Sequence, residues 1–115
     1  MASIDFGGVV EEVTTRDEFP MEKAREVLKD EVIAVIGYGV QGPAQGLNMR
    51  DNGFNVIIGQ SKRFERDWNR AIEDGWVPGE TLFEVEEAAR RATVIQVLVS
   101  DAAQRDIWPA IKQCL

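Results

Sequence analysis

The stretch VIAVIGYGVQGPAQGLNMRDNGFNVIIGQSKR, residues 32–63, decides the fold. It opens on an apolar, β-branched run at 32–36, which is typical of a strand buried on both faces of a sheet. A helix is predicted from about 41 to 50, because the turn formers at 51–53 stop it. A second strand is predicted at 54–58. The stretch therefore reads as strand, glycine-rich turn, helix and strand.

The rest of the chain continues this alternation. Thr81 is expected to cap a helix, with Glu84 three residues on as its capping-box partner. Pro109 is expected to bend or divide the last helix. Alternating strands and helices predict a parallel sheet with right-handed crossovers. The fold class is therefore α/β, a Rossmann-like doubly wound parallel sheet with three clear strands and a possible short one. The further predicted elements are a helix at about 20–29, a helix at 64–75, a very short strand within 76–79, a helix from 81, a strand at 93–99 and a helix at about 102–115.

The chain divides into an N-terminal arm with its helix, 1–30, and a nucleotide-binding part, 31–115. The segment FGGVVEEV at 6–13 is either a short strand or an extended arm. A doubly wound dinucleotide domain has two mononucleotide-binding halves and about six strands. Since these residues supply one half and the start of the second, we expect a truncated piece of a longer protein.

Composition excludes several kinds of function. The formal net charge of −7 argues against general nucleic-acid binding, which requires a basic face. There is no histidine, and Cys114 is the only cysteine, so it is predicted to be a bystander rather than an activated nucleophile. The acidic start lacks the features of a signal peptide, and no apolar run approaches the roughly 20 residues that cross a bilayer. A cytosolic protein is predicted.

The glycine motif predicts a phosphate-binding turn. Gly37 permits a tight turn out of the strand, Gly39 lets backbone approach a pyrophosphate, and Gly42 lets helix and strand pack closely. The helix start then offers free N–H groups and a positive dipole end to the phosphates. Within this strand–turn–helix–strand unit the motif indicates a dinucleotide site rather than a bare turn.

The end of the second strand indicates which dinucleotide is bound. NAD-binding sites usually place Asp or Glu there, where it accepts hydrogen bonds from the ribose 2′-OH. Here the position falls near Gln60, and Ser61, Lys62 and Arg63 follow. A hydroxyl and two cations would hold a 2′-phosphate through charge-assisted bonds, so the predicted ligand is NADP(H). The alternative is that Lys62 and Arg63 are solvated loop charges.

At these residues the sequence resembles the N-terminal domain of ketol-acid reductoisomerase. The stretch IGYGVQGPAQGLNMRDNGFNVIIG looks like the family's segment around its glycine motif. The arm DFGGVVEEVTTRDEFPMEKAREVLKDE and the segment DGWVPGETLFEVEEA look like a bacterial branch of the family. The resemblance covers essentially the whole chain. It implies an NADPH- and magnesium-dependent enzyme of branched-chain amino-acid biosynthesis. That enzyme isomerises an acetohydroxy acid by alkyl migration and reduces the product to a dihydroxy acid.

The resemblance also implies roles for single residues. Tyr38, Gly39, Val40 and Gln41 match the pyrophosphate loop, and 61–63 lie in the loop that grips the 2′-phosphate. Pro43 stands where many members of the family have histidine. The first turn of a helix tolerates proline, so this difference should not disturb the fold. A segment lining the nicotinamide side of the cofactor is matched by Asp101, Ala102, Ala103 and Gln104. These last residues can also be read as a helix start capped by Ser100 or Asp101, and both readings can hold.

No catalytic or metal-binding residue is assigned. The family's catalytic histidine would lie beyond Leu115, and its Mg²⁺-binding carboxylates belong to a helical C-terminal domain, so Mg²⁺ and the acetohydroxy acid are expected only in the full-length enzyme. Glu84, Glu86 and Glu87 are expected on a solvated helix face. Two other functions stay open: a stand-alone module that senses dinucleotide without hydride transfer, and a fragment whose exposed sheet edge drives self-association.

Overall fold

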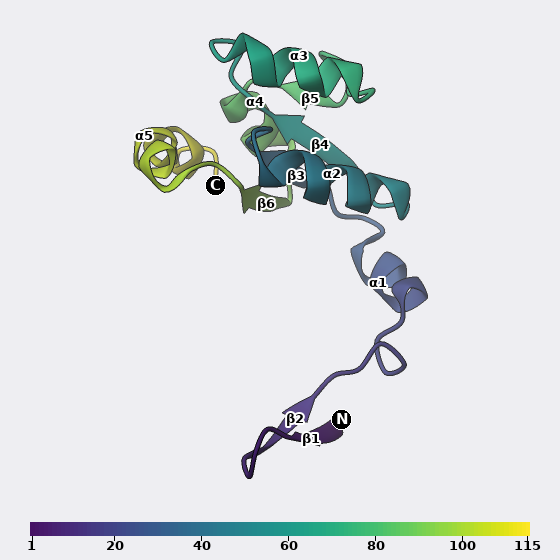
Figure 1. The fold of residues 1–115 in the computed structure, drawn as a ribbon. Coiled ribbons are helices and arrows are strands. Elements are labelled where there is room, and N and C mark those ends of the chain that lie inside the picture. The colour runs from purple at the N-terminus through teal and green to yellow at the C-terminus, as the bar shows by residue number, and fades with distance from the viewer. The chain divides into compact units, whose positions relative to one another are not determined.

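A computed structural model describes all 115 residues and divides them into two units, Met1–Asp30 and Glu31–Leu115. In the first unit, strands β1 (Ala2–Asp5) and β2 (Val10–Val13) form an antiparallel hairpin, followed by helix α1 (Met21–Leu28) (Figure 1). The N-terminal segment is therefore a hairpin with short strands. The predicted helix at about 20–29 is confirmed.

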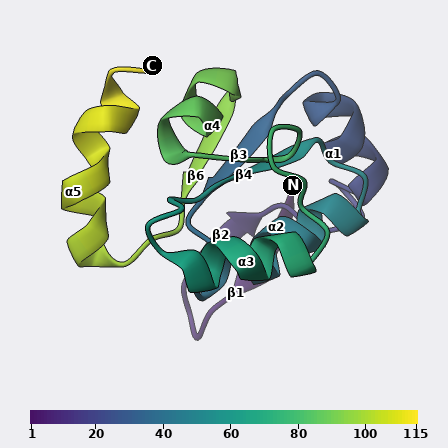
Figure 2. The same cartoon turned by 90° about the horizontal axis from the view of Figure 1, so that it is seen from above.

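The second unit is a four-stranded parallel sheet with the order β5-β4-β3-β6. Figure 2 shows helices α2 and α3 on one face of this sheet and α4 and α5 on the other. The predicted α/β class with a parallel sheet is confirmed. The strands are β3 (Ile33–Ile36), β4 (Val56–Gly59), β5 (Leu82–Phe83) and β6 (Val94–Val97), and the helices are α2 (Gln41–Asp51), α3 (Glu65–Glu73), α4 (Val85–Arg91) and α5 (Asp101–Lys112).

Two apolar layers enclose the central strands, because β3 and β4 are buried at every residue. Side chains alternate along β3, so Val35 packs with Trp68 and Leu82 on the α2–α3 side. Ala34 and Ile36 point to the opposite side, where they pack with residues of α4 and α5 such as Ala88 and Ile111. Burial of both faces explains why these strands are continuous apolar runs rather than alternating ones.

The predicted capping box at Thr81 is wrong. Leu82 and Phe83 form strand β5, and α4 begins only at Val85. Pairing with β4 gives this segment backbone partners that a helix would not: the N–H of Ile58 donates to Thr81 O at 2.8 Å. The hydroxyl of Thr81 accepts the N–H of Val77 at 2.7 Å instead of capping a helix. The short strand predicted within 76–79 therefore lies a few residues later.

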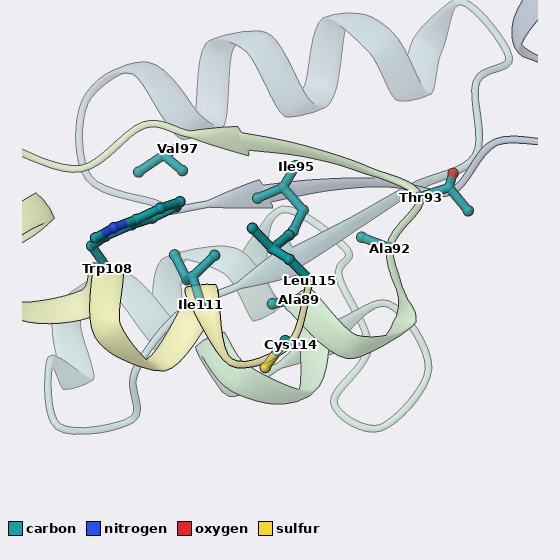
Figure 3. Close-up of a pocket in the computed structure, with 9 residues that line it drawn as sticks. All are labelled: Ala89, Ala92, Thr93, Ile95, Val97, Trp108, Ile111, Cys114 and Leu115. Atoms are coloured by element: carbon teal, nitrogen blue, oxygen red, sulfur yellow. The ribbon is translucent and has the colours of Figure 1, made fainter.

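Strand β6 forms one edge of the sheet, because its only partner is β3. Helix α5 continues through Pro109 without dividing and buries Ile111 beside α4. Beside β6 lies an edge groove of about 500 Å³, where Trp108 and Leu115 stay 49% and 78% exposed (Figure 3). The helix thus covers part of a sheet face but leaves the strand edge open.

No helix in the chain is both long enough and apolar enough to cross a membrane.

Candidate functional site

The glycine loop lies where the carboxyl ends of parallel strands meet, which is the usual ligand side of an open α/β sheet. A glycine-loop pocket of about 430 Å³ is formed there by segments that follow three neighbouring strands. Its lining residues are Gly37, Tyr38, Gly39, Val40 and Gln41 after β3, Gln60, Phe64 and Asp67 after β4, and Leu98, Val99, Ser100 and Ala103 after β6.

Close packing around the loop requires glycine at two of its positions. Gly37 has a φ of +104°, and a Cβ there would lie 2.7 Å from the carbonyl oxygen of Leu98. A Cβ on Gly42 would overlap the carbonyl oxygen of Gly37. Gly39 differs, because the nearest atom to an added Cβ would be a carboxylate oxygen of Asp67 at 3.9 Å. The structure therefore uses Gly37 and Gly42 for packing, whereas the space at Gly39 is open.

The loop offers unused hydrogen-bond donors to the pocket. The N–H groups of Gly39 and Val40 donate no hydrogen bond within the chain. Helix α2 starts next to them, has no side-chain cap and carries no acidic residue in its first turn. Pro43 lies in that turn. The positive dipole end of α2 is therefore not neutralised by a carboxylate of its own first turn, an arrangement suited to an anion.

The side chain of Tyr38 anchors this loop to the core. It is fully buried, its hydroxyl donates to Asp74 Oδ2 at 2.7 Å, and it accepts the indole N–H of Trp76 at 2.9 Å. Burial, and next the hydrogen bond to the Asp74 carboxylate, raise the pKa of Tyr38 to about 12. The guanidinium of Arg50 completes the network by donating to the backbone oxygen of Asp74 at 2.9 Å. The backbone of Tyr38 therefore lines the pocket, and its buried side chain anchors that backbone to the core.

Gln60 makes a second anchor and does not project into solvent as a cofactor-selecting residue would. It is 6% exposed, and its Oε1 accepts the N–H of Tyr38 at 2.8 Å. Its amide group Nε2 donates to the backbone oxygen of Ser61 at 3.3 Å. Both polar ends are therefore committed, so the first residue facing outward after β4 is Ser61.

A second pocket of about 570 Å³, the Ser61–Glu84 pocket, shares Phe64 with the first. The loop after β4, residues 61–63, carries two cations that pack on aromatic rings. Lys62 Nζ lies 5.1 Å from the ring centre of Trp68, and Arg63 Cζ lies 5.1 Å from that of Phe64. Glu84 meets the same loop, since its Oε1 accepts the N–H of Lys62 at 3.1 Å. Two cations and one carboxylate therefore lie close together at the loop after β4.

The start of α5 closes the glycine-loop pocket on the β6 side. The N-cap reading of this segment is confirmed, because Ser100 Oγ accepts the N–H of Ala103 at 3.4 Å. The amide of Gln104 donates to the backbone oxygen of Val99 at 3.4 Å. Ala103 lines the pocket, so the two interpretations of this segment are compatible.

Comparison with known proteins identifies the family. The family model described as "Acetohydroxy acid isomeroreductase, NADPH-binding domain" matches residues 27–115. The chain belongs to the ketol-acid reductoisomerase family. This confirms the resemblance seen in the sequence.

The similar ketol-acid reductoisomerases are much longer proteins. "Ketol-acid reductoisomerase (NAD(+))" of Desulfosudis oleivorans is 60% identical over 115 residues, which is 100% of this chain and 32% of its own. The mitochondrial enzyme of Saccharomyces cerevisiae is 53% identical over 115 residues, 100% of this chain and 29% of its own. A solved NADH-preferring ketol-acid reductoisomerase from an uncultured archean has a TM-score of 0.71 and 35% identity, covering 77% of this chain and 27% of its own. The chain therefore spans less than a third of the length of these relatives.

Eight of the predicted site residues of this ketol-acid reductoisomerase chain line one of the two pockets. Gly37, Tyr38, Gly39, Val40, Gln41 and Ala103 line the glycine-loop pocket, and Ser61 and Arg63 line the Ser61–Glu84 pocket. Gly42, Lys62, Asp101, Ala102 and Gln104 line neither. Of these, Gly42 acts through packing, and Lys62 borders the second pocket through its bond to Glu84.

Sequence reasoning did not assign several of the residues that line the two pockets. Leu98 and Val99, for example, are expected only as the end of a strand. Phe64 and Asp67 occur at helical spacing in a segment that was treated only as a helix, so no local signal marked them as pocket residues. Glu84 was assigned to a solvated helix face, whereas the structure places it before α4 against Lys62. No group of three or more Asp, Glu, His or Cys side chains is arranged to hold a metal ion.

Proposed function

We propose that this chain is the pyridine-dinucleotide-binding part of a ketol-acid reductoisomerase. The observation that carries the proposal is the pair of unused N–H groups, on Gly39 and Val40, beside the start of α2, which has no acidic residue in its own first turn. The complete enzyme would convert acetohydroxy acids such as 2-acetolactate to 2,3-dihydroxy acids in branched-chain amino-acid biosynthesis. The bound cofactor would supply the hydride for its reductive step.

Each end of the dinucleotide has a place in this proposal. The pyrophosphate binds to the N–H groups of Gly39 and Val40. The nicotinamide end extends toward Ala103 at the start of α5, and the adenosine end extends past Phe64 into the Ser61–Glu84 pocket. The buried side chains of Tyr38 and Gln60 hold the glycine loop in position from the core side.

NADPH is the proposed cofactor, with a modest preference over NADH. Ser61, Lys62 and Arg63 supply a hydroxyl and two cations beside the adenosine end. The cation–π contacts that now hold Lys62 and Arg63 are worth about 0.5–1 kcal/mol at exposed positions, so a phosphate competes with them easily. The relatives bear names that refer to NAD as well, which makes the cofactor preference the first property to measure.

Magnesium binding and the acetohydroxy-acid substrate are assigned to parts of the enzyme outside these residues. The carboxylates of this chain form no cluster that fits a metal ion, and there is no histidine to transfer a proton. We therefore expect the purified 115-residue chain to bind cofactor but not to consume acetolactate when NADPH and Mg²⁺ are present. Turnover above a protein-free control would contradict this assignment.

The proposal is tested by replacing Gly39 with valine. An added side chain meets open space in the free chain, so the melting temperature should stay unchanged. The same side chain fills the pocket beside the pyrophosphate donors, so calorimetric titration should show at least a tenfold loss of NADPH affinity, about 1.4 kcal/mol. Unchanged affinity in the folded variant, or no binding by the unmodified chain, would contradict the proposal.

We also infer that the chain associates with itself. Strand β6 has an unpaired edge, and exposed edges recruit further strands. Trp108 and Leu115 add exposed apolar surface beside it (Figure 3). The buried Oε1 of Gln96 on β6 has no hydrogen-bond partner. A second copy of the chain would supply both backbone partners and apolar cover.

A further inference from the structure

An acidic residue, Glu84, lies beside the loop that follows β4, next to the place proposed for the adenosine end of the dinucleotide. Gly59 and Phe83 are paired across β4 and β5, so Gln60 and Glu84 follow directly at the same edge of the sheet. The side chain of Gln60 turns inward and accepts the N–H of Tyr38. Glu84 is therefore the polar side chain that faces outward at this edge. Glu84 is exposed, and its carboxylate reaches across to the N–H of Lys62 at 3.1 Å.

The charge around Glu84 is not dominated by cations. The lining of the Ser61–Glu84 pocket includes four carboxylates and two guanidinium groups. Arg90 lies 3.5 Å from a carboxylate oxygen of Glu86 and 3.9 Å from one of Glu87, so its charge is already balanced. Arg63 is then the one lining cation left to face the other two acids. The charged lining residues are Glu84, Glu86, Glu87, Asp106, Arg63 and Arg90.

We propose that Glu84 is a specificity-determining residue of the cofactor site. Its carboxylate accepts a hydrogen bond from a ribose 2′-hydroxyl and repels a 2′-phosphate, which carries about −1.5 to −2 charges. The acid that a dinucleotide fold usually places at the end of its second strand is supplied here from the neighbouring strand. Lys62 and Arg63 attract the phosphate that Glu84 repels, so the chain accepts both cofactors with a small difference in affinity. This inference rests on the proposed dinucleotide binding.

The test is Glu84→Gln, because glutamine removes the charge and keeps an oxygen that can accept the N–H of Lys62. Dissociation constants for NADPH and for NADH are measured by calorimetry for both proteins. The variant should bind NADPH about threefold to tenfold more tightly, since one like charge has gone from a partly solvated site. Its NADH affinity should stay equal or fall. Its NADPH affinity should also decrease more steeply with added salt, because uncompensated cations then dominate.

Glu73→Gln is the matched control, since it removes the same charge from the exposed last residue of α3, away from both pockets. It should leave the ratio of the two affinities unchanged. The inference is overturned if Glu84→Gln behaves like this control, or if it shifts both affinities by the same factor, which would indicate an effect on loop structure alone. In those cases binding by the unmodified chain still supports the proposed function. Failure of the unmodified chain to bind either dinucleotide would overturn both.

Discussion

Replacing Gln60 with leucine tests whether this residue supports the glycine loop or selects the cofactor. Leucine has a similar size but no polar atoms, so the buried N–H of Tyr38 would lose the acceptor it now has at 2.8 Å. Leaving a buried donor without a partner costs about 1–3 kcal/mol. The apolar surface that leucine buries offsets part of this, so we expect a loss of about 1–2 kcal/mol in the free energy of unfolding.

Urea denaturation measures this loss. With a slope of about 1–3 kcal/mol per molar, the unfolding midpoint should fall by roughly 1 M. Gln113→Leu is the control, because its side chain is exposed just after α5 and its substitution should leave the midpoint nearly unchanged. The affinities for NADPH and NADH should both decrease, by the same factor, because a loosened loop affects the shared pyrophosphate.

Two results would refute this reasoning. An unchanged midpoint for Gln60→Leu would mean that its hydrogen bond to Tyr38 does not form. A selective change in affinity for one cofactor would mean that Gln60 faces the ribose after all.

Other properties of the chain can be measured independently. Replacing Lys62 and Arg63 together with aspartate should reverse the preference from NADPH to NADH in a titration, and equal affinity of the unmodified chain for both cofactors would contradict the role of these cations. The free energy of unfolding should fall between pH 10 and about 12, because the unfolded chain releases the Tyr38 proton near its ordinary pKa while the folded chain holds it to higher pH; a Tyr38→Phe variant that shows the same fall would argue against this. Sedimentation at increasing concentration should show dimers or larger species that Trp108→Ser weakens, whereas a single monomeric species throughout would refute self-association.

The sequence was sufficient for the parts of the fold that depend on local pattern. The apolar runs of β3 and β4 are buried strands because they carry no polar residues that would favour a solvated face. The conformations of Gly37 and Gly42 follow from the spacing of the motif, since a side chain at either position would collide with neighbouring backbone. These features need no knowledge of distant contacts.

Other features depend on contacts between segments far apart in the chain. The segment that begins with Thr81 has the pattern of a helix cap, but backbone hydrogen bonds from β4 draw its first residues into β5. The direction of Gln60 depends on the N–H of Tyr38, 22 residues away, which needs an acceptor once it is buried. Glu84 reaches the loop after β4 only because β5 pairs with β4. Local spacing contains none of this information.

The most direct test of cofactor binding at the carboxyl ends of the sheet is a map of backbone amide shifts during titration with NADPH. If the site is as described, the largest shifts should occur for the amides of Gly39 and Val40, with further changes at 61–64 and at 98–104. No saturable shifts, or shifts concentrated in the edge groove beside β6, would contradict it.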